Sequence, residues 1–233
     1  MLDLTRRKNR LAVVRAAFPH TLPVLMGFMV LGIAYGVLMQ SKGYGVLWSV
    51  LMSAVAFCGS MQYVAITLLT APFAPFSAFF MSLLVNARHV FYGLSMLDAY
   101  HGAGAKKFPL IYLMCDETYS LVSSVQPPEG IDRQDFDLAI SVLDYLYWVA
   151  ATAIGALLGG ALAGVDLTGL DFALTALFVV LLLEQWRKKE NRPSALIGLG
   201  GAALCLVLFG ADSFVLPALL VILAALLLGR DKL

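Results

Sequence analysis

Apolar runs of about 20 residues, separated by short polar or basic segments, follow one another along almost the whole chain and constrain its fold most strongly. A helix of that length crosses a hydrocarbon core of about 30 Å. The composition agrees, because 61% of the 233 residues are hydrophobic and only 13% are charged, against about 25% charged in an average soluble domain. The sequence therefore predicts an all-α, polytopic helical membrane protein.

The apolar runs predict about eight transmembrane segments. Their ranges are 16–40, 46–71, 76–97, 108–125, 138–162, 170–186, 194–209 and 214–228. The stretch 108–125 is short and carries two acids, so six or seven crossings are the alternatives. A turn is expected at 42–45. We interpret residues 1–233 as a single transmembrane domain. Within it, a hydrophilic loop joins two halves, 1–126 and 137–233.

Lys and Arg residues cluster at the ends of the apolar runs, mainly near the N-terminus and at 187–192. With eight crossings and a cytoplasmic N-terminus, almost all of the 16 basic residues lie inside. Only Lys42, Lys106 and Lys107 then lie outside, and Arg88 lies within the membrane. The positive-inside rule therefore places both termini in the cytoplasm, although six crossings satisfy it equally well. Because topology explains the basic clusters, no nucleic-acid partner is expected.

Glycines are spaced so that they share helix faces. Gly32 and Gly36 lie four residues apart in the first run, and Gly155, Gly159 and Gly160 form a second small-residue face. Small residues at this spacing let two helix backbones approach closely in a membrane. We expect these faces to serve helix contacts, with substrate contacts as the alternative.

Three charged residues fall where a bilayer would hold them: Arg88, Asp116 and Glu117. An ionisable group inside a membrane costs about 3 kcal/mol or more, so it normally has a partner and a function. Pairing of Arg88 with one of the acids would lower this cost. Alternatively, Arg88 extends to the lipid headgroups, and the two acids lie solvated in an interfacial loop.

The neighbours of Arg88 favour a functional interpretation. Asn86 and His89 flank it, and Tyr92 shares its helix face. His89 is either a proton relay or a hydrogen-bonded interior histidine.

Asp116 and Glu117 are adjacent, so on a helix they point about 100° apart. One can pair with Arg88 while the other contacts substrate or exchanges protons. Gln62 and Ser60 in the second run either bind a polar substrate group or bond to a neighbouring helix. Gln62 is expected to point inward, whereas Asp144 lies near the entrance of its run and is expected at the membrane interface.

Three runs of sequence carry a resemblance to a known family: Phe57-Cys58-Gly59-Ser60-Met61-Gln62, Asn86-Ala87-Arg88-His89-Val90-Phe91-Tyr92-Gly93 and Asp116-Glu117-Thr118. In this order the chain resembles the large subunit of the AzlC-type (azaleucine-resistance) branched-chain amino acid exporters over nearly its whole length. The resemblance implies a small membrane subunit of the AzlD type as partner and a location in the bacterial inner membrane. It makes Gln62, Asn86, Arg88, Asp116 and Glu117 candidates for the substrate and coupling pathway, with Ser60, His89, Tyr92 and Thr118 as secondary candidates.

The leading hypothesis is a proton-linked secondary transporter that exports branched-chain amino acids of the valine, leucine and isoleucine type, with methionine as a further candidate. No G-x-x-x-x-G-K-[ST] motif is present, so an ion gradient would supply the energy. The three cysteines show no CxxC spacing, and no metal, disulfide framework, cofactor or catalytic residue is expected. The rival hypotheses are a channel or scaffolding subunit without its own transport site and, less favoured, an intramembrane enzyme using His89 and the acids.

Overall fold

The computed structural model describes residues 2–72, 74–161, 192–210 and 214–229, with single positions between 179 and 189. The regular elements of this part are all helical, as expected. They are α1 (Leu2–Ser41), α2 (Val46–Val55), α3 (Gly59–Thr70), α4 (Pro75–Val85), α5 (Arg88–Ser95), the 3₁₀ helix η1 (Gly104–Lys106), α6 (Lys107–Tyr112), α7 (Asp116–Ser124), α8 (Arg133–Ala161), α10 (Arg192–Phe209) and α11 (Val215–Gly229). The described helices fall into two units, one with α1–α3 and α5–α8 and one with α4, α10 and α11.

Three described helices are long and apolar enough to cross a membrane. They comprise Leu11–Ser41 of α1, the whole of α8 and the whole of α10. Large apolar side chains are exposed on several helices, including Leu47, Trp48 and Val207, as expected for surfaces that face lipid. The predicted segment 170–186 lies outside the described residues apart from single positions. The number of crossings and the side of the termini remain predictions.

The predicted turn after the first span is confirmed. Gly43 has a φ of 88°, and the N–H of Tyr44 donates to the carbonyl of Met39 at 3.0 Å. This is the glycine C-cap pattern in which a left-handed residue lets the chain close the last helical turn. Pro19 and Pro23 lie inside α1 without ending it.

The second, third and fourth predicted spans are each interrupted in their interior, which the sequence analysis did not predict. Range 46–71 forms α2 and α3 with a break at 56–58, range 76–97 contains the break at 86–87, and range 108–125 contains the break at 113–115. Cys58 and Cys115, just before α3 and α7, have extended backbones. These three breaks are the positions around which the polar residues gather.

Tertiary contacts explain why α2 ends in an apolar sequence. The hydroxyl of Tyr112 donates to the carbonyls of Ala54 and Val55, both at 2.8 Å, and the hydroxyl of Tyr145 donates to Ala54 at 3.0 Å. Carbonyls freed at a helix end must find partners inside a membrane. Tyrosines from α6 and α8 therefore stabilise the break.

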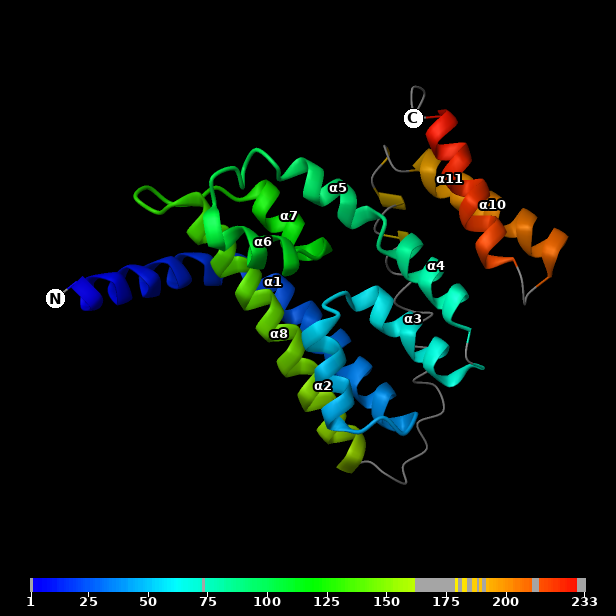
Figure 1. Ribbon diagram of the computed structural model, residues 1–233, viewed down its shortest axis with the longest axis horizontal. Coiled ribbons are helices and arrows are strands. Elements are labelled where there is room, and N and C mark those ends of the chain that lie inside the picture. Colours follow the sequence, from blue (N-terminus) through cyan, green and yellow to red (C-terminus); the bar gives the residue numbers. More distant parts are fainter. Residues whose placement is uncertain are drawn as a thin grey trace. The chain divides into compact units, whose positions relative to one another are not determined.

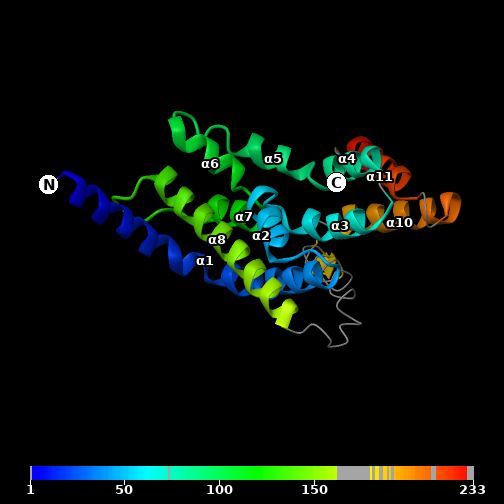
Figure 2. The ribbon, with the colours of Figure 1, turned by 60° about the horizontal axis from the view of Figure 1, so that its bottom comes forward.

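Figures 1 and 2 show α1 and α8 side by side along much of their length. A Cβ added to Gly32 would lie 2.6 Å from Cβ of Ala151, and one added to Gly36 would lie 2.5 Å from the backbone nitrogen of Ala156. A Cβ on Gly155 would collide with the carbonyl of Ile33. The prediction that the two glycine faces serve helix contacts is confirmed for α1 and α8.

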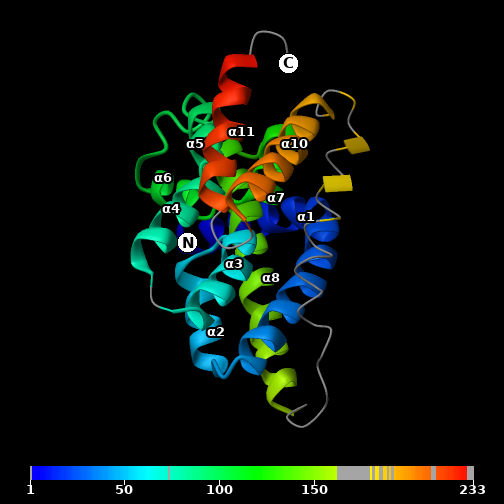
Figure 3. The same cartoon turned by 90° about the vertical axis from the view of Figure 1, so that its right-hand side faces the viewer.

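The second unit contains the helix pair α10 and α11 (Figure 3). Gly210, with a φ of 72°, follows the end of α10. Gly201 of α10 faces Ile222 of α11, because a Cβ at Gly201 would lie 2.7 Å from the Ile222 side chain. Small residues thus permit close helix packing here as well.

Candidate functional site

Arg88 is the first residue of α5, and its guanidinium links three helix starts. Its Nη1 lies 2.9 Å from Oδ2 of Asp116, the first residue of α7, and its Nη2 donates to Oγ of Ser60 in α3 at 2.5 Å. The predicted pairing of Arg88 with an acid is therefore present, and Asp116 is the partner. The two side chains are 37% and 34% exposed, so the pair is accessible from outside the protein core.

The guanidinium keeps an unused donor. Nε of Arg88 is buried and has no hydrogen-bond partner. Arginine offers five N–H donors in a fixed fork, suited to carboxylates. The helix dipoles act differently on the two partners. The dipole of α7 stabilises Asp116 at its first residue, whereas the dipole of α5 disfavours the cation of Arg88 at its first residue, which Asp116 compensates.

Tyr92 contacts the same acid. Its hydroxyl donates to Oδ1 of Asp116 at 2.8 Å, as its place on the Arg88 face of α5 allows. The Tyr92 ring stacks on Tyr119 of α7, with centroids 4.4 Å apart and an interplanar angle of 14°. Asp116 is thus held on one oxygen by a cation and on the other by a hydroxyl.

Asn86 and His89 hold the break before α5. Oδ1 of Asn86 accepts a hydrogen bond from Sγ of Cys58 at 2.9 Å, which ties this break to the one before α3. Nδ1 of His89 donates to the carbonyl of Asn86 at 3.2 Å, and its ring packs edge-on against Tyr92. Of the two alternatives for His89, the geometry supports a hydrogen-bonded histidine that shapes the site.

Gln62 points inward as predicted, with 1% of its surface exposed. Nε2 donates to Oγ of Ser53 at 2.8 Å, and Oε1 accepts from Nε1 of Trp148 at 2.6 Å. Ser53 in turn is hydrogen-bonded to Thr152 at 2.8 Å. Both ends of the amide are occupied, which supports the helix-bonding alternative for Gln62.

Asp144 was expected at the membrane interface, and this expectation is wrong. The residue lies well inside α8 and is fully buried, with 0% exposed. Its Oδ2 accepts a hydrogen bond of 2.8 Å from Thr118, a predicted secondary site residue on α7. Its Oδ1 has no hydrogen-bond partner.

The burial of Asp144 could have been predicted from the residues that share its helix face, although its position near the end of the run suggested otherwise. Ser141, Asp144, Trp148, Thr152 and Gly155 recur at intervals of three or four residues. Such residues share one helix face. Because that face also carries the close-packing glycines, it had to face protein, and Asp144 with it. In the described part of the chain, no group of three or more His, Cys, Asp or Glu residues could hold a metal ion.

Fold and site together define an all-helical membrane protein in which an ion pair lies where three helix breaks meet. Helices interrupted within the membrane, with polar groups at the interruption, are typical of substrate and ion sites in secondary transporters. Residues 23–162, which include every site residue described above, match the AzlC protein family. The chain belongs to this family.

The relatives of this chain are membrane and transport proteins. The chain is 44% identical to the Bacillus subtilis (strain 168) branched-chain amino acid transport protein AzlC, over 99% of this chain and 90% of that protein. It is 37% identical to an uncharacterized membrane protein of Helicobacter pylori (strain ATCC 700392 / 26695), over 96% and 97%. It is 26% identical to the Escherichia coli (strain K12) inner membrane protein YgaZ, over 79% of each chain. No solved structure matches the chain.

Proposed function

We propose that this chain is the large subunit of a proton-linked secondary transporter that exports branched-chain amino acids across the bacterial inner membrane, together with a small AzlD-type subunit. The observation that carries the proposal is the Arg88–Asp116 pair at 2.9 Å, at the meeting point of three helix breaks. The name of the Bacillus subtilis relative supports the substrate class, and that of the Escherichia coli relative supports the membrane.

The pair matches a zwitterion in charge. An amino acid needs a cation for its carboxylate and an anion for its ammonium, and Arg88 and Asp116 supply one of each. The buried Nε of Arg88 offers a donor that no protein group uses. Both side chains are about one third exposed, so a substrate can reach both charged groups. A substrate that inserts between them replaces one ion pair by two.

Asp144 suits the role of proton carrier better than Asp116, which is bound to a cation. Asp144 is fully buried, its Oδ1 has no hydrogen-bond partner, and a buried charge without a cation is costly. Its contact Thr118 lies two residues after Asp116 in the first turn of α7. Substrate binding at Asp116 that shifts α7 would therefore alter the surroundings of Asp144 and release its proton. Glu117, which lies between Asp116 and Thr118 in the sequence, adds a second carboxylate to the same turn of α7.

The test uses inverted membrane vesicles, in which export appears as uptake into the vesicle. Vesicles containing the large chain, with and without its small partner, are given labelled valine and an imposed pH gradient. We expect uptake that depends on the gradient and disappears when a protonophore collapses it. Absence of such uptake in both preparations, with the protein present in the membrane, would overturn the exporter proposal and leave the channel or scaffolding alternative.

A further inference from the structure

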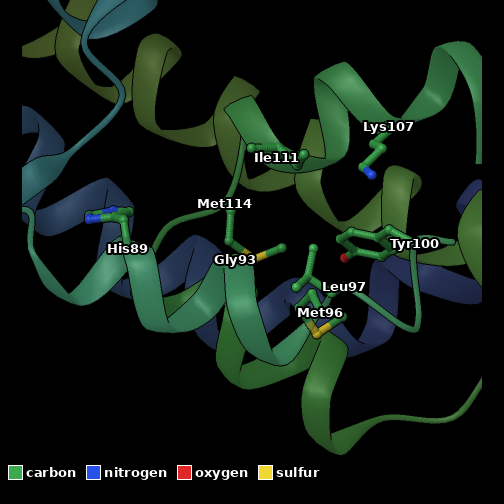
Figure 4. A pocket seen from close by; sticks show the side chains of 8 residues that line it. All are labelled: His89, Gly93, Met96, Leu97, Tyr100, Lys107, Ile111 and Met114. Carbon is green, nitrogen blue, oxygen red and sulfur yellow. The ribbon is translucent and has the colours of Figure 1, made fainter.

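A cavity of about 100 Å³ lies between α5, the chain that follows it and α6. Its apolar lining is formed by Met96, Leu97, Ile111 and Met114, with Gly93 opening one side. Figure 4 shows Met114, Gly93, Leu97 and Met96 between His89 on one side and Tyr100 on the other. Lys107 also lines the cavity, which therefore has an apolar middle and polar ends.

The cavity and the ion pair share the same short segments. On α5, Arg88 and Tyr92 contact Asp116, whereas His89 and Gly93, each one position further on, line the cavity. Met114, which also lines it, lies two residues before Asp116 in the break before α7. One helix turn of α5 thus presents the charged groups on one face and the cavity on the next.

The protein does not fill this space with its own atoms. A Cβ added to Gly93 would have no atom within 4 Å. The hydroxyl of Tyr100 is buried and has no hydrogen-bond partner, although the residue is only 2% exposed. Leu97 and Ile111 are 52% and 53% exposed, so the cavity is open at the protein surface, where a ligand can enter it.

We infer that this cavity receives the aliphatic side chain of the amino acid whose charged groups bind Arg88 and Asp116; the inference rests on the proposed function. A dry apolar cavity of about 150 Å³ accepts benzene, so one of about 100 Å³ fits a branched chain of three or four carbons. The thioethers of Met96 and Met114 adapt to differently branched groups. The cavity selects by side-chain size, whereas the ion pair binds the groups common to all amino acids.

The test compares leucine with alanine in the vesicle assay, because both share the charged groups and differ only in the side chain. Gly93→Leu fills the cavity. Gly27→Leu is the matched control, since Gly27 is also a helical glycine with no atom within 4 Å of an added Cβ and does not line the cavity. We expect Gly93→Leu to lower the leucine-to-alanine flux ratio about tenfold or more, and Gly27→Leu to leave it unchanged.

A second variant guards against misfolding of the first. Met114→Ala enlarges the cavity and should raise the phenylalanine-to-leucine flux ratio several-fold. If the wild-type protein transports leucine but Gly93→Leu and Met114→Ala leave their respective flux ratios unchanged, the cavity inference is overturned and the proposed function stands. A wild-type protein that transports no amino acid would overturn the proposed function, and the cavity inference with it.

Discussion

The Arg88→Ala variant tests whether the ion pair of Arg88 and Asp116 serves transport or only stabilises the fold. The substitution removes the contacts to Asp116 and Ser60. An exposed ion pair contributes about 0–1 kcal/mol and a hydrogen bond to a charged group about 1.5–3 kcal/mol. Because the guanidinium is 37% exposed, we expect a loss of roughly 2 kcal/mol, which corresponds to a fall of about 4–8 °C in Tm.

The expected loss of transport is much larger than the loss of stability. Without the guanidinium, the substrate carboxylate loses its cation, and truncation of one partner of a close charge pair costs about 2–5 kcal/mol. Flux per folded molecule should therefore fall at least about 30-fold. Arg88→Lys keeps the charge but cannot contact both Ser60 and Asp116 with a rigid guanidinium. Its flux should therefore lie between that of the wild type and that of Arg88→Ala.

The assay combines Tm from fluorescence-detected size exclusion in detergent with labelled-valine flux in vesicles, normalised to folded protein. Arg133→Ala is the control. Arg133 pairs with Asp137 at 3.1 Å, far from the candidate site in sequence, and its removal leaves that fully buried acid without its cation. This control should lower Tm more than Arg88→Ala does and leave flux per folded molecule unchanged. If Arg88→Ala reduces flux only in step with the amount of folded protein, the pair is structural and our reasoning is refuted.

Three further predictions concern other parts of the chain. Glu117→Gln should abolish flux at unchanged membrane levels, because it removes a carboxylate of α7 that adjoins Asp116 and Thr118, the contact of Asp144; unchanged flux would exclude a role for this charge. Asp144→Asn keeps an acceptor for Thr118 but carries no proton, so pH-gradient-driven accumulation should disappear while exchange of internal for external valine persists; retained accumulation would assign the proton elsewhere. Gly155→Ala forces a Cβ onto the carbonyl of Ile33, so it should lower the yield and Tm of folded protein by an amount equivalent to about 1–3 kcal/mol, whereas Gly198→Ala, with open space around it, should not.

Much of the local architecture could be predicted from the sequence because it depends on residues near one another. Four-residue spacing placed Tyr92 on the Arg88 face, and both contact Asp116. The same rule found the glycine faces, and the turn at Gly43 followed from the conformational freedom of glycine. The sequence could not decide whether Asp116 or Glu117 pairs with Arg88. Adjacent residues point to different faces of a helix, and only the packing of α7 determines which face meets Arg88.

The helix breaks could not be predicted because distant residues fix them. Range 46–71 is one continuous apolar run, and no proline lies near the end of α2. The free carbonyl of Ala54 is satisfied by Tyr112 and Tyr145, which are 58 and 91 residues away in the chain. Asp144 was misjudged for a related reason: its distance from the end of the run was considered, and the helix face on which it lies was not.

At Gly36, Gly155 and Ile33, the peptide groups of α1 and α8 are in direct contact, with no side chain between them. No rotamer change can absorb sliding at these three positions, so we expect the two helices to move together. Under the proposed function, we expect the movement that exposes the site to fall to the short helices α3, α5 and α7, which begin at the breaks and carry Ser60, Arg88 and Asp116.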